Sequence, residues 1–489
     1  MAELAHRLRP RLEACAGRAL TLLFYPDDRR LSRWMGRALS ALMWLGGAVV
    51  WGFVLDWGRI GFDVHDWTQE GPRYAFLRQA LLEGRLPLHI GSALASTTRF
   101  LSIPDTLISP QIVLLRWMEP GPFVLLNVLF LYSLGFLGLV LLARKLKASP
   151  FTFLVMFLLV MLNGHPVAQI AVSHTMWAAY FLLPYFALLL LELGQGLVGW
   201  GWVVRMALPQ FGLDLQGGFH FVNWCLMFLL LWGLTWRPAL APLLKAIAAS
   251  LLVGMVRILP AALEFGATER SFISGYFSVT DLVRGFIELR PPQQALTGLN
   301  ASLGWWEVDA YTGLLGFGFL VVCGIYLTAR DTVAGGRSLL PPVLLLTVLS
   351  LGKFYQPVTW LPLPLVTAER VSSRFIIVPM VLTVILGGVA FERWLQGRRL
   401  RTGHILLLLT LGVVAAHDLL QHARLWRIEN MQLLFPLMSV DIRAQVLTLS
   451  DPPYEASLIV GLLASAFAFA GLIGLAARER RLAAVKRGG

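Results

Sequence analysis

Long apolar runs, rich in Leu, Val and Phe, alternate with short polar segments along most of the chain. Several runs approach the ~20 residues that an α-helix needs to cross a bilayer. A closed β-barrel, the other fold that spans membranes, would instead show short segments of alternating hydrophobicity. The pattern predicts an all-α fold: a polytopic helical membrane protein with about 12 transmembrane helices.

The predicted spans are separated by segments that hold most of the charged residues. The spans cover about residues 39–55, 123–143, 151–162, 176–193, 238–260, 311–328, 339–351, 376–391, 404–420 and 458–476, and two more lie within about 200–235.

The composition supports this class. The chain is 57% hydrophobic and 14% charged, whereas soluble domains carry roughly 25% charged residues. The net charge of +13 does not indicate nucleic-acid binding, because the basic residues gather in short segments beside the apolar runs. That distribution is typical of the cytoplasmic side of a membrane protein. We therefore expect no nucleic-acid partner, a lipid bilayer environment, and an integral, multi-pass protein of the inner (plasma) membrane.

The charge bias also orients the predicted regions. Residues 1–37 and 477–489 are short and strongly basic, and we expect both in the cytoplasm. Residues 38–476 form the predicted transmembrane domain. Its predicted outer loops cover about 57–118, 261–310, 353–372 and 421–455, and Trp305 and Trp306 are expected at the membrane interface.

The first outer loop combines two carboxylates with an amphipathic run. Asp63 and Asp66 flank His65 soon after the first apolar run. Over residues 72–83 the apolar side chains fall mostly on one helical face, which predicts an interfacial helix that lies on the bilayer. We expect this helix to end at Gly84.

A polar, acid-bearing loop beside a membrane bundle suits chemistry on a lipid-linked substrate. Transfer of a sugar from a lipid phosphate needs a carboxylate that acts on the acceptor hydroxyl as a general base. It also needs cations where charge develops on the departing phosphate. The candidate bases are Asp66 and Asp63. The candidate substrate-binding residues are the cations Arg270, Arg370 and Arg374 and the hydrogen-bond donors His65, His174 and His220.

Each of these residue types also has an ordinary structural role. The aspartates fit solvated loop carboxylates, the histidines fit interior polar groups with satisfied hydrogen bonds, and Arg374 fits a side chain that snorkels to the interface. Arg205 and Arg257 stand within apolar runs, where ionisable residues are functional candidates by default. Pairing with Asp214 or Glu264 would also satisfy them.

No spacing of Cys, His or acidic residues predicts a metal site or a disulfide framework. Cys15, Cys225 and Cys323 are far apart in the sequence, and the last two lie inside apolar runs. We predict no cofactor, and a requirement for a divalent metal stays open.

Three stretches carry a resemblance to a known family. They read Asp66-x-x-Gln69-x-x-Pro72 followed by Leu-Leu-Glu-Gly-Arg-Leu-Pro-Leu at residues 81–88, then Trp305-Trp306-Glu307, then Glu369-Arg370-Val-Ser-Ser-Arg374-Phe375. In this order they resemble bacterial membrane proteins of the YfhO-like, GT-C glycosyltransferase type.

The resemblance implies a multi-spanning GT-C-like fold with a catalytic acid in the first outer loop. It also implies a polyprenyl-phosphate-linked sugar as the donor. Carried over by position, it gives the acid role to Asp66 and adds Gln69 and Glu307 to the substrate-binding candidates.

Two other functions fit the same sequence. A transporter or flippase for a lipid-linked solute would rely on His174, Arg205 and Arg257 inside the bundle and would show internal repeats. No clear inverted repeat is evident. A non-catalytic subunit of a membrane assembly would need only the apolar runs, and no sequence feature identifies its protein partners.

Overall fold

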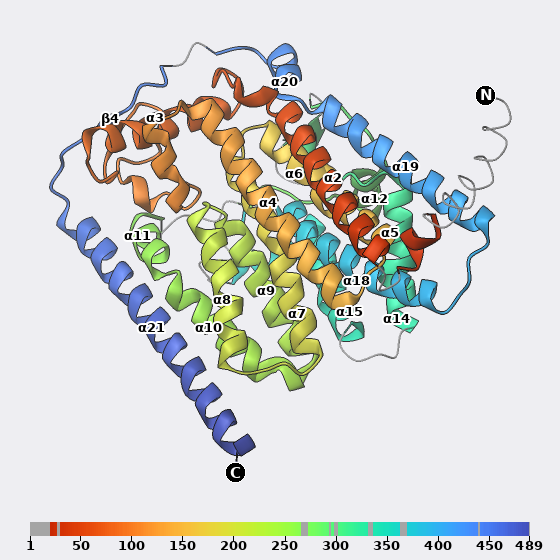
Figure 1. Cartoon of the computed structure of the whole chain (residues 1–489). Coiled ribbons are helices and arrows are strands. Elements are labelled where there is room, and N and C mark those ends of the chain that lie inside the picture. The colour runs from red at the N-terminus through yellow and green to blue at the C-terminus, as the bar shows by residue number, and fades with distance from the viewer. Residues whose placement is uncertain are drawn as a thin grey trace.

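The computed structural model describes residues 20–26, 30–265, 272–292, 295–297, 302–330, 336–361, 369–438 and 441–488. These residues form a bundle of helices with two short two-stranded sheets. Figure 1 shows the helices side by side across the bundle, with α3 and β4 at one end. The chain is an all-α helical membrane protein, as its apolar runs predict.

Eight helices of the described residues are long and apolar enough to cross a membrane. Their helical segments are α2 (Arg30–Val54), α4 (Pro120–Leu146), α5 (Pro150–Met161) with α6 (Gly164–Ala171), α7 (Leu183–Gly194), α13 (Gly313–Phe319) with α14 (Thr328–Arg330), α18 (Ile377–Gln396), α19 (Thr402–Leu425) and α21 (Pro452–Gly488). The helix of α7 begins earlier, in a 3-10 turn at Thr175–Leu182, and a π-helical segment at Leu320–Leu327 joins α13 to α14.

A bent pair of helices would supply a ninth span. α10 (Leu240–Val253) and α11 (Met255–Phe265) are bent by 72° relative to each other. The helices α8 (Trp200–Leu215), α9 (Phe219–Thr235) and α15 (Leu340–Ser350) are shorter. The expected count of about twelve spans therefore stays a prediction.

Helices in the middle of the bundle bury their apolar residues against one another. α18 contacts α5, α7 and α15, and most of its side chains are buried. A helix that is hydrophobic all round belongs in such a core. The helices α2, α19 and α21 lie at the periphery and expose many large apolar side chains. Apolar surfaces of this extent require lipid or a partner as their surroundings.

The acid-bearing loop after α2 leads into α3 (Trp67–Glu83), which begins earlier than the predicted residue 72. The helix ends at Gly84, whose left-handed φ of 67° favours glycine, so the predicted stop is confirmed. Tyr74, Phe76 and Leu77 are buried, because α3 packs against protein at Pro110–Arg116 and α4.

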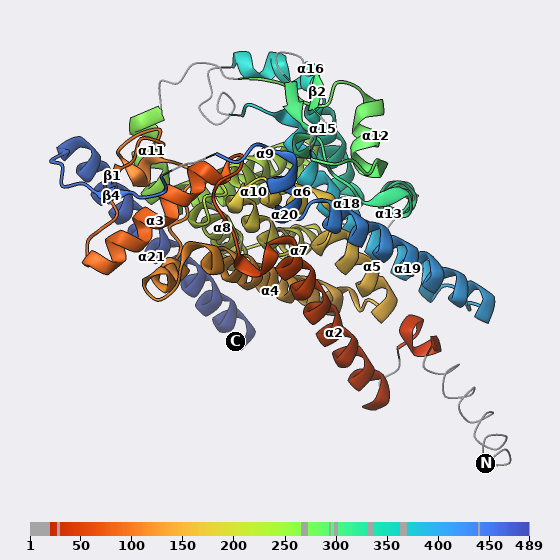
Figure 2. The same ribbon diagram turned by 90° about the horizontal axis from the view of Figure 1, so that it is seen from above.

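Two short, separate sheets join loops of the protein. β1 (Ile90–Gly91) pairs antiparallel with β4 (Gln445–Val446), which ties the first outer loop to the segment before α21. β2 (Ala295–Thr297) pairs antiparallel with β3 (Ser302–Gly304). Figure 2 shows β2 close to α12 (Val279–Ile287) and α16 (Gly352–Tyr355), beside the helices of the bundle.

Candidate functional site

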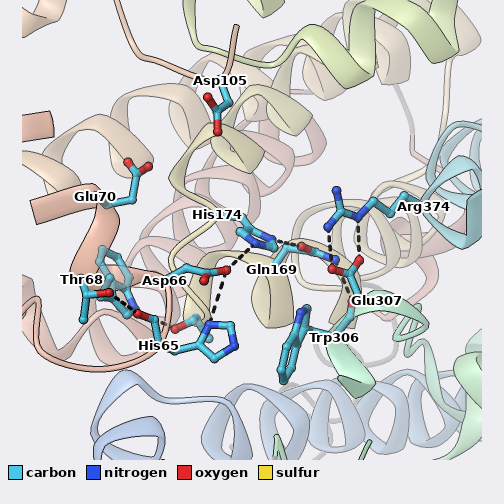
Figure 3. A network of polar contacts seen from close by, with 12 residues as sticks. His65, Asp66, Thr68, Glu70, Asp105, Gln169, His174, Trp306, Glu307 and Arg374 are labelled. Atoms are coloured by element: carbon cyan, nitrogen blue, oxygen red, sulfur yellow. Dashed lines mark hydrogen bonds and ion pairs between the residues drawn. The ribbon is translucent and has the colours of Figure 1, made fainter. Parts of the chain in front are cut away.

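Asp66 stands at the N-terminal end of α3, where an aspartate usually caps the helix. Its side chain makes no capping hydrogen bond. Instead, Nε2 of His174 donates to Oδ2 of Asp66 at 3.1 Å, and Nδ1 of His65 lies 3.5 Å from the same oxygen (Figure 3). Two histidines therefore surround the carboxylate that the sequence predicts as a base.

The backbone is strained beside both members of the Asp66–His174 pair. His65 has a φ of 48° and Ser173 has a φ of 88°, in the left-handed region that side chains rarely adopt. Each of these residues directly precedes one member of the pair. Strain of this kind costs about 1–3 kcal/mol per residue and clusters at functional sites. The strain therefore supports a functional role for the pair.

An arginine–glutamate pair forms the other half of the site. Nε and Nη2 of Arg374 donate to the two carboxylate oxygens of Glu307 at 2.6 and 2.5 Å. The guanidinium carbon lies 4.9 Å from the ring centre of Trp177. Within the described part of the chain, Nη1 of Arg374 makes no hydrogen bond. A planar, stacked guanidinium with a spare donor is suited to bind a phosphate or a carboxylate.

Gln169 connects the two halves. Its Oε1 accepts a hydrogen bond from Nδ1 of His174, and its Nε2 donates to the backbone oxygen of Trp306 at 2.7 Å. Both ring nitrogens of His174 thus face side-chain oxygens, one of Asp66 and one of Gln169. Figure 3 shows Asp66, His174, Gln169 and Glu307 in one row.

Opposing effects set the charges of the two carboxyl groups. Burial raises the pKa of Asp66, but the hydrogen bond and charge of His174, with the charges of His65 and Arg374, outweigh it and lower that pKa. Burial likewise raises the pKa of Glu307, but Arg374 outweighs it and the pKa falls to about 2. Both carboxylates are therefore charged at neutral pH.

Asp66 is the most accessible of these side chains. It is 39% exposed, whereas His174 and Arg374 are each 13% exposed and Glu307 is 9% exposed. A molecule that approaches the network therefore contacts the carboxylate of Asp66 before it contacts the Arg374–Glu307 pair.

A second charged cluster, absent from the predicted site, adjoins His174. Nη1 of Arg73 donates to Glu70 at 2.6 Å and to Asp105 at 3.2 Å, and Glu70 also accepts from the hydroxyl of Thr175 at 3.1 Å. Burial raises the pKa of Glu70 despite the charge of Arg73. At Asp105 burial also raises the pKa, but Arg73 outweighs it and the pKa is lowered.

His220 lies at the edge of the site and is held by a buried acid. Its Nδ1 donates to a carboxylate oxygen of Glu369 at 3.0 Å, and Asn223 donates to the other oxygen at 3.2 Å. The ring of His220 lies 5.8 Å from that of Trp177, over which Arg374 stacks. Glu369 appears in the sequence only within the family-like stretch, and no pattern assigned it a role.

Among the described residues, Asp63, Gln69 and Arg370 do not join the network. Asp63 accepts a hydrogen bond from Gln432 at 3.3 Å. Gln69 and Arg370 are exposed, and the structure gives their side chains no hydrogen bond within the described ranges. Arg270 lies outside the described residues.

The two arginines within apolar runs have their partners outside this network. Arg205 pairs with Glu192 at 2.7 Å. Arg257 donates to backbone oxygens of residues 101–106 at 3.0–3.1 Å, and Glu264, one of its expected partners, pairs instead with Arg99 at 2.9 Å.

Within the described ranges, no group of three His, Cys, Asp or Glu residues is placed to hold a metal ion. No protein-family model matches the chain, and neither a curated protein nor a solved structure was found to be similar to it. The assignment of a function therefore depends on the site itself.

Proposed function

We propose that this protein is a membrane glycosyltransferase that moves a sugar from a polyprenyl-phosphate donor to a lipid, glycan or protein acceptor. The observation that carries the proposal is the convergence of Asp66, His174 and the Arg374–Glu307 pair from segments distant in sequence. An accessible carboxylate, a hydrogen-bonding imidazole and a guanidinium with a spare donor are the groups that this reaction requires.

Asp66 takes the proton of the acceptor hydroxyl while that oxygen attacks the anomeric carbon of the sugar. The bond between the anomeric carbon and the phosphate oxygen breaks, and the polyprenyl phosphate leaves with an additional negative charge. Nη1 of Arg374 and the ring of His174 stabilise that charge. The lowered pKa of Asp66 supports this role, because the carboxylate is deprotonated at neutral pH.

The proposal also includes an orientation. Positive-inside charge bias places both termini in the cytoplasm and the Asp66 loop on the outer face of the inner membrane. The number of transmembrane spans reaches about twelve if the bent pair α10 and α11 and the shorter helices α8, α9 and α15 all cross the membrane.

The decisive test is Asp66→Asn, which keeps the shape of the side chain and removes the base. We expect the loss of at least ~100-fold in transfer rate, the lower end of what a positioned base contributes. The measurement compares envelope glycans and glycolipids, by mass spectrometry, in a deletion strain that carries the wild-type or the variant chain at equal membrane level.

Two further variants keep the result interpretable. Glu119→Gln removes an exposed carboxylate that pairs with Arg78 at 2.7 Å, and it should restore the glycans fully. Asp63→Asn tests the alternative base, and it should retain most of the activity. Full restoration by Asp66→Asn, or no glycan difference between the deletion and wild-type strains, would count against a transferase. The second result would favour a non-catalytic assembly subunit.

A further inference from the structure

An apolar groove lies between α4, α7 and α8, away from the candidate site. α4 contacts α7 and α7 contacts α8, and Figure 1 shows the three helices side by side. The groove has a volume of about 530 Å³, and leucines from all three helices supply most of its lining, together with Phe130 and Tyr185. Phe130, Leu141 and Leu208 are also exposed at its surface. This volume and lining suit a hydrocarbon chain.

One end of the groove carries a cation. Arg205 lines the groove, pairs with Glu192 at 2.7 Å, and is 50% exposed. Glu192 also pairs with Lys145 at 3.1 Å. One carboxylate between two cations leaves a net positive charge, so an anionic group beside Arg205 would be attracted. Basic pockets between membrane helices bind the anionic head groups of lipids by this chemistry.

The other end of the groove lies toward the candidate site. Gln111 and Gln216 line it, and Gln111 donates to Asn127 at 2.8 Å. The backbone oxygen of Leu215 accepts from Ile108 at 2.9 Å, so the C-terminal end of α8 lies against the loop that contains Asp105.

The position of Arg205 excludes one occupant. Arg205 and Leu215 are ten residues apart in the same helix, which corresponds to ~15 Å at a rise of about 1.5 Å per residue. A lipid whose phosphate is held by Arg205 therefore keeps that phosphate far from the Asp66 network. It is not a sugar donor in position for transfer.

We propose that this groove binds one acyl chain of an anionic glycerophospholipid, with the phosphate of its head group at Arg205. The apolar lining holds the chain, and the cation at one end selects an anionic head group over a zwitterionic one. This site is independent of the proposed transferase activity, so either proposal stands if the other fails.

The test uses the full-length protein, purified in detergent and delipidated, with phosphatidylglycerol and phosphatidylcholine of equal chain length as probes. Native mass spectrometry gives the ratio of the two lipids bound. We expect the wild type to prefer phosphatidylglycerol by about tenfold, which is ~1.4 kcal/mol. Arg205→Ala should abolish the preference, and Arg205→Lys should keep most of it.

Two variants distinguish the groove from the surrounding surface. Leu208→Trp fills the groove, so it should reduce the binding of both lipids. Lys245→Ala removes an exposed cation beside Trp200, outside the groove, and should leave the preference unchanged. A third, Leu230→Trp, adds the same bulk to the exposed surface of α9 and controls for the effect of the tryptophan on folding.

Three results would overturn the proposal. The first is equal binding of the two lipids by the wild type. The second is an unchanged preference in Arg205→Ala, which would place the head group elsewhere. The third is displacement of phosphatidylglycerol by an equal concentration of farnesyl phosphate, which would identify a prenyl phosphate as the occupant.

Discussion

Two buried arginines, Arg257 and Arg374, lie in apolar helical segments. They differ in the groups that accept hydrogen bonds from their guanidinium nitrogens. Arg257 is 3% exposed, and its Nη nitrogens donate to the backbone oxygens of Leu101, Ile103, Pro104 and Thr106 and to the Thr106 hydroxyl. Arg374 donates to the carboxylate of Glu307 and keeps one nitrogen without a partner among the residues described.

The difference shows how the partner of an arginine in an apolar segment indicates its role. Neutral carbonyls of one loop accept hydrogen bonds from both Nη nitrogens of Arg257, while its Nε is buried without a partner among the described residues, so the guanidinium fixes the conformation of that loop. A carboxylate satisfies Arg374, and the same network contains the accessible carboxylate of Asp66. The sequence predicts both arginines as functional candidates, but only the second stands beside the groups that we propose to act on a substrate.

The largest expected effect comes from Arg257→Leu. The change removes this donor from the oxygens of Leu101, Pro104 and Thr106, whereas the oxygen of Ile103 keeps the Thr106 hydroxyl; at about 1–3 kcal/mol each, we expect a loss of roughly 3–9 kcal/mol. Thermal unfolding in lipid nanodiscs measures this loss of stability. Arg205→Leu is the matched control, because Arg205 is half exposed and its surface ion pair contributes ~0–1 kcal/mol. Equal stability of the two variants would show that the loop contacts of Arg257 are not structural.

The next effect separates stability from activity at Arg374. Arg374→Met leaves the buried charge of Glu307 without its partner, which lowers the stability of the fold by about 3–5 kcal/mol. Combining it with Glu307→Gln removes that charge, so the double variant should recover most of the stability. We expect transfer to stay lost in the double variant, because the guanidinium that is proposed to stabilise the departing phosphate is absent. Recovery of transfer together with stability would make the pair purely structural.

Continuous apolar runs with basic ends made several helices predictable. The prediction at 123–143 corresponds to α4 (Pro120–Leu146), and that at 404–420 corresponds to α19 (Thr402–Leu425). Trp305 shows the limit of such patterns. The sequence predicts it at the membrane interface, but no pattern predicts that it is 1% exposed and that Arg290 stacks on its ring.

The site was predictable in residue type and not in arrangement. Asp66, His174 and Arg374 stand out as polar residues beside apolar runs, so the sequence indicates them. Glu70 and Asp105 carry no such signal, because their role depends on sharing Arg73, and that contact joins segments 32 residues apart. Only the tertiary fold decides which of the many loop carboxylates pairs with an arginine.

A third prediction uses pH to separate the two arginines. The pKa of Glu307 falls to about 2 from an ordinary 4.5, so its stabilising contribution is complete above pH 4.5 and is lost as the pH falls to about 2. At about 1.36 kcal/mol per unit, the contribution is ~3 kcal/mol. The difference in stability between the wild type and Glu307→Gln should therefore be ~3 kcal/mol at pH 7 and close to zero at pH 2.

The control for that experiment is Arg257→Leu. Its hydrogen-bond acceptors are neutral carbonyls and a hydroxyl, so no proton competes for them between pH 7 and pH 2. The stability difference between the wild type and this variant should change less over this window than the Glu307→Gln difference, because the charges of Asp214 and Asp105 act on Arg257 without a direct hydrogen bond. A difference that falls in parallel for both variants would remove the distinction between the two arginines.

The smallest expected effects come from one hydroxyl at each arginine. Thr106→Val removes an acceptor of Arg257 and a donor to the Ile103 oxygen, and Ser373→Ala removes the donor to the Glu307 backbone oxygen. Each change should cost ~1 kcal/mol of stability, the usual net value of a hydrogen bond.

The effects of these two variants on transfer should differ. The serine orients the residue that holds Arg374, so Ser373→Ala should slow transfer several-fold, whereas Thr106→Val should leave the rate unchanged. Equal rates in the two variants, measured with the glycan assay at matched membrane level, would mean that the loop held by Arg257 and the pair formed by Arg374 serve the same purpose.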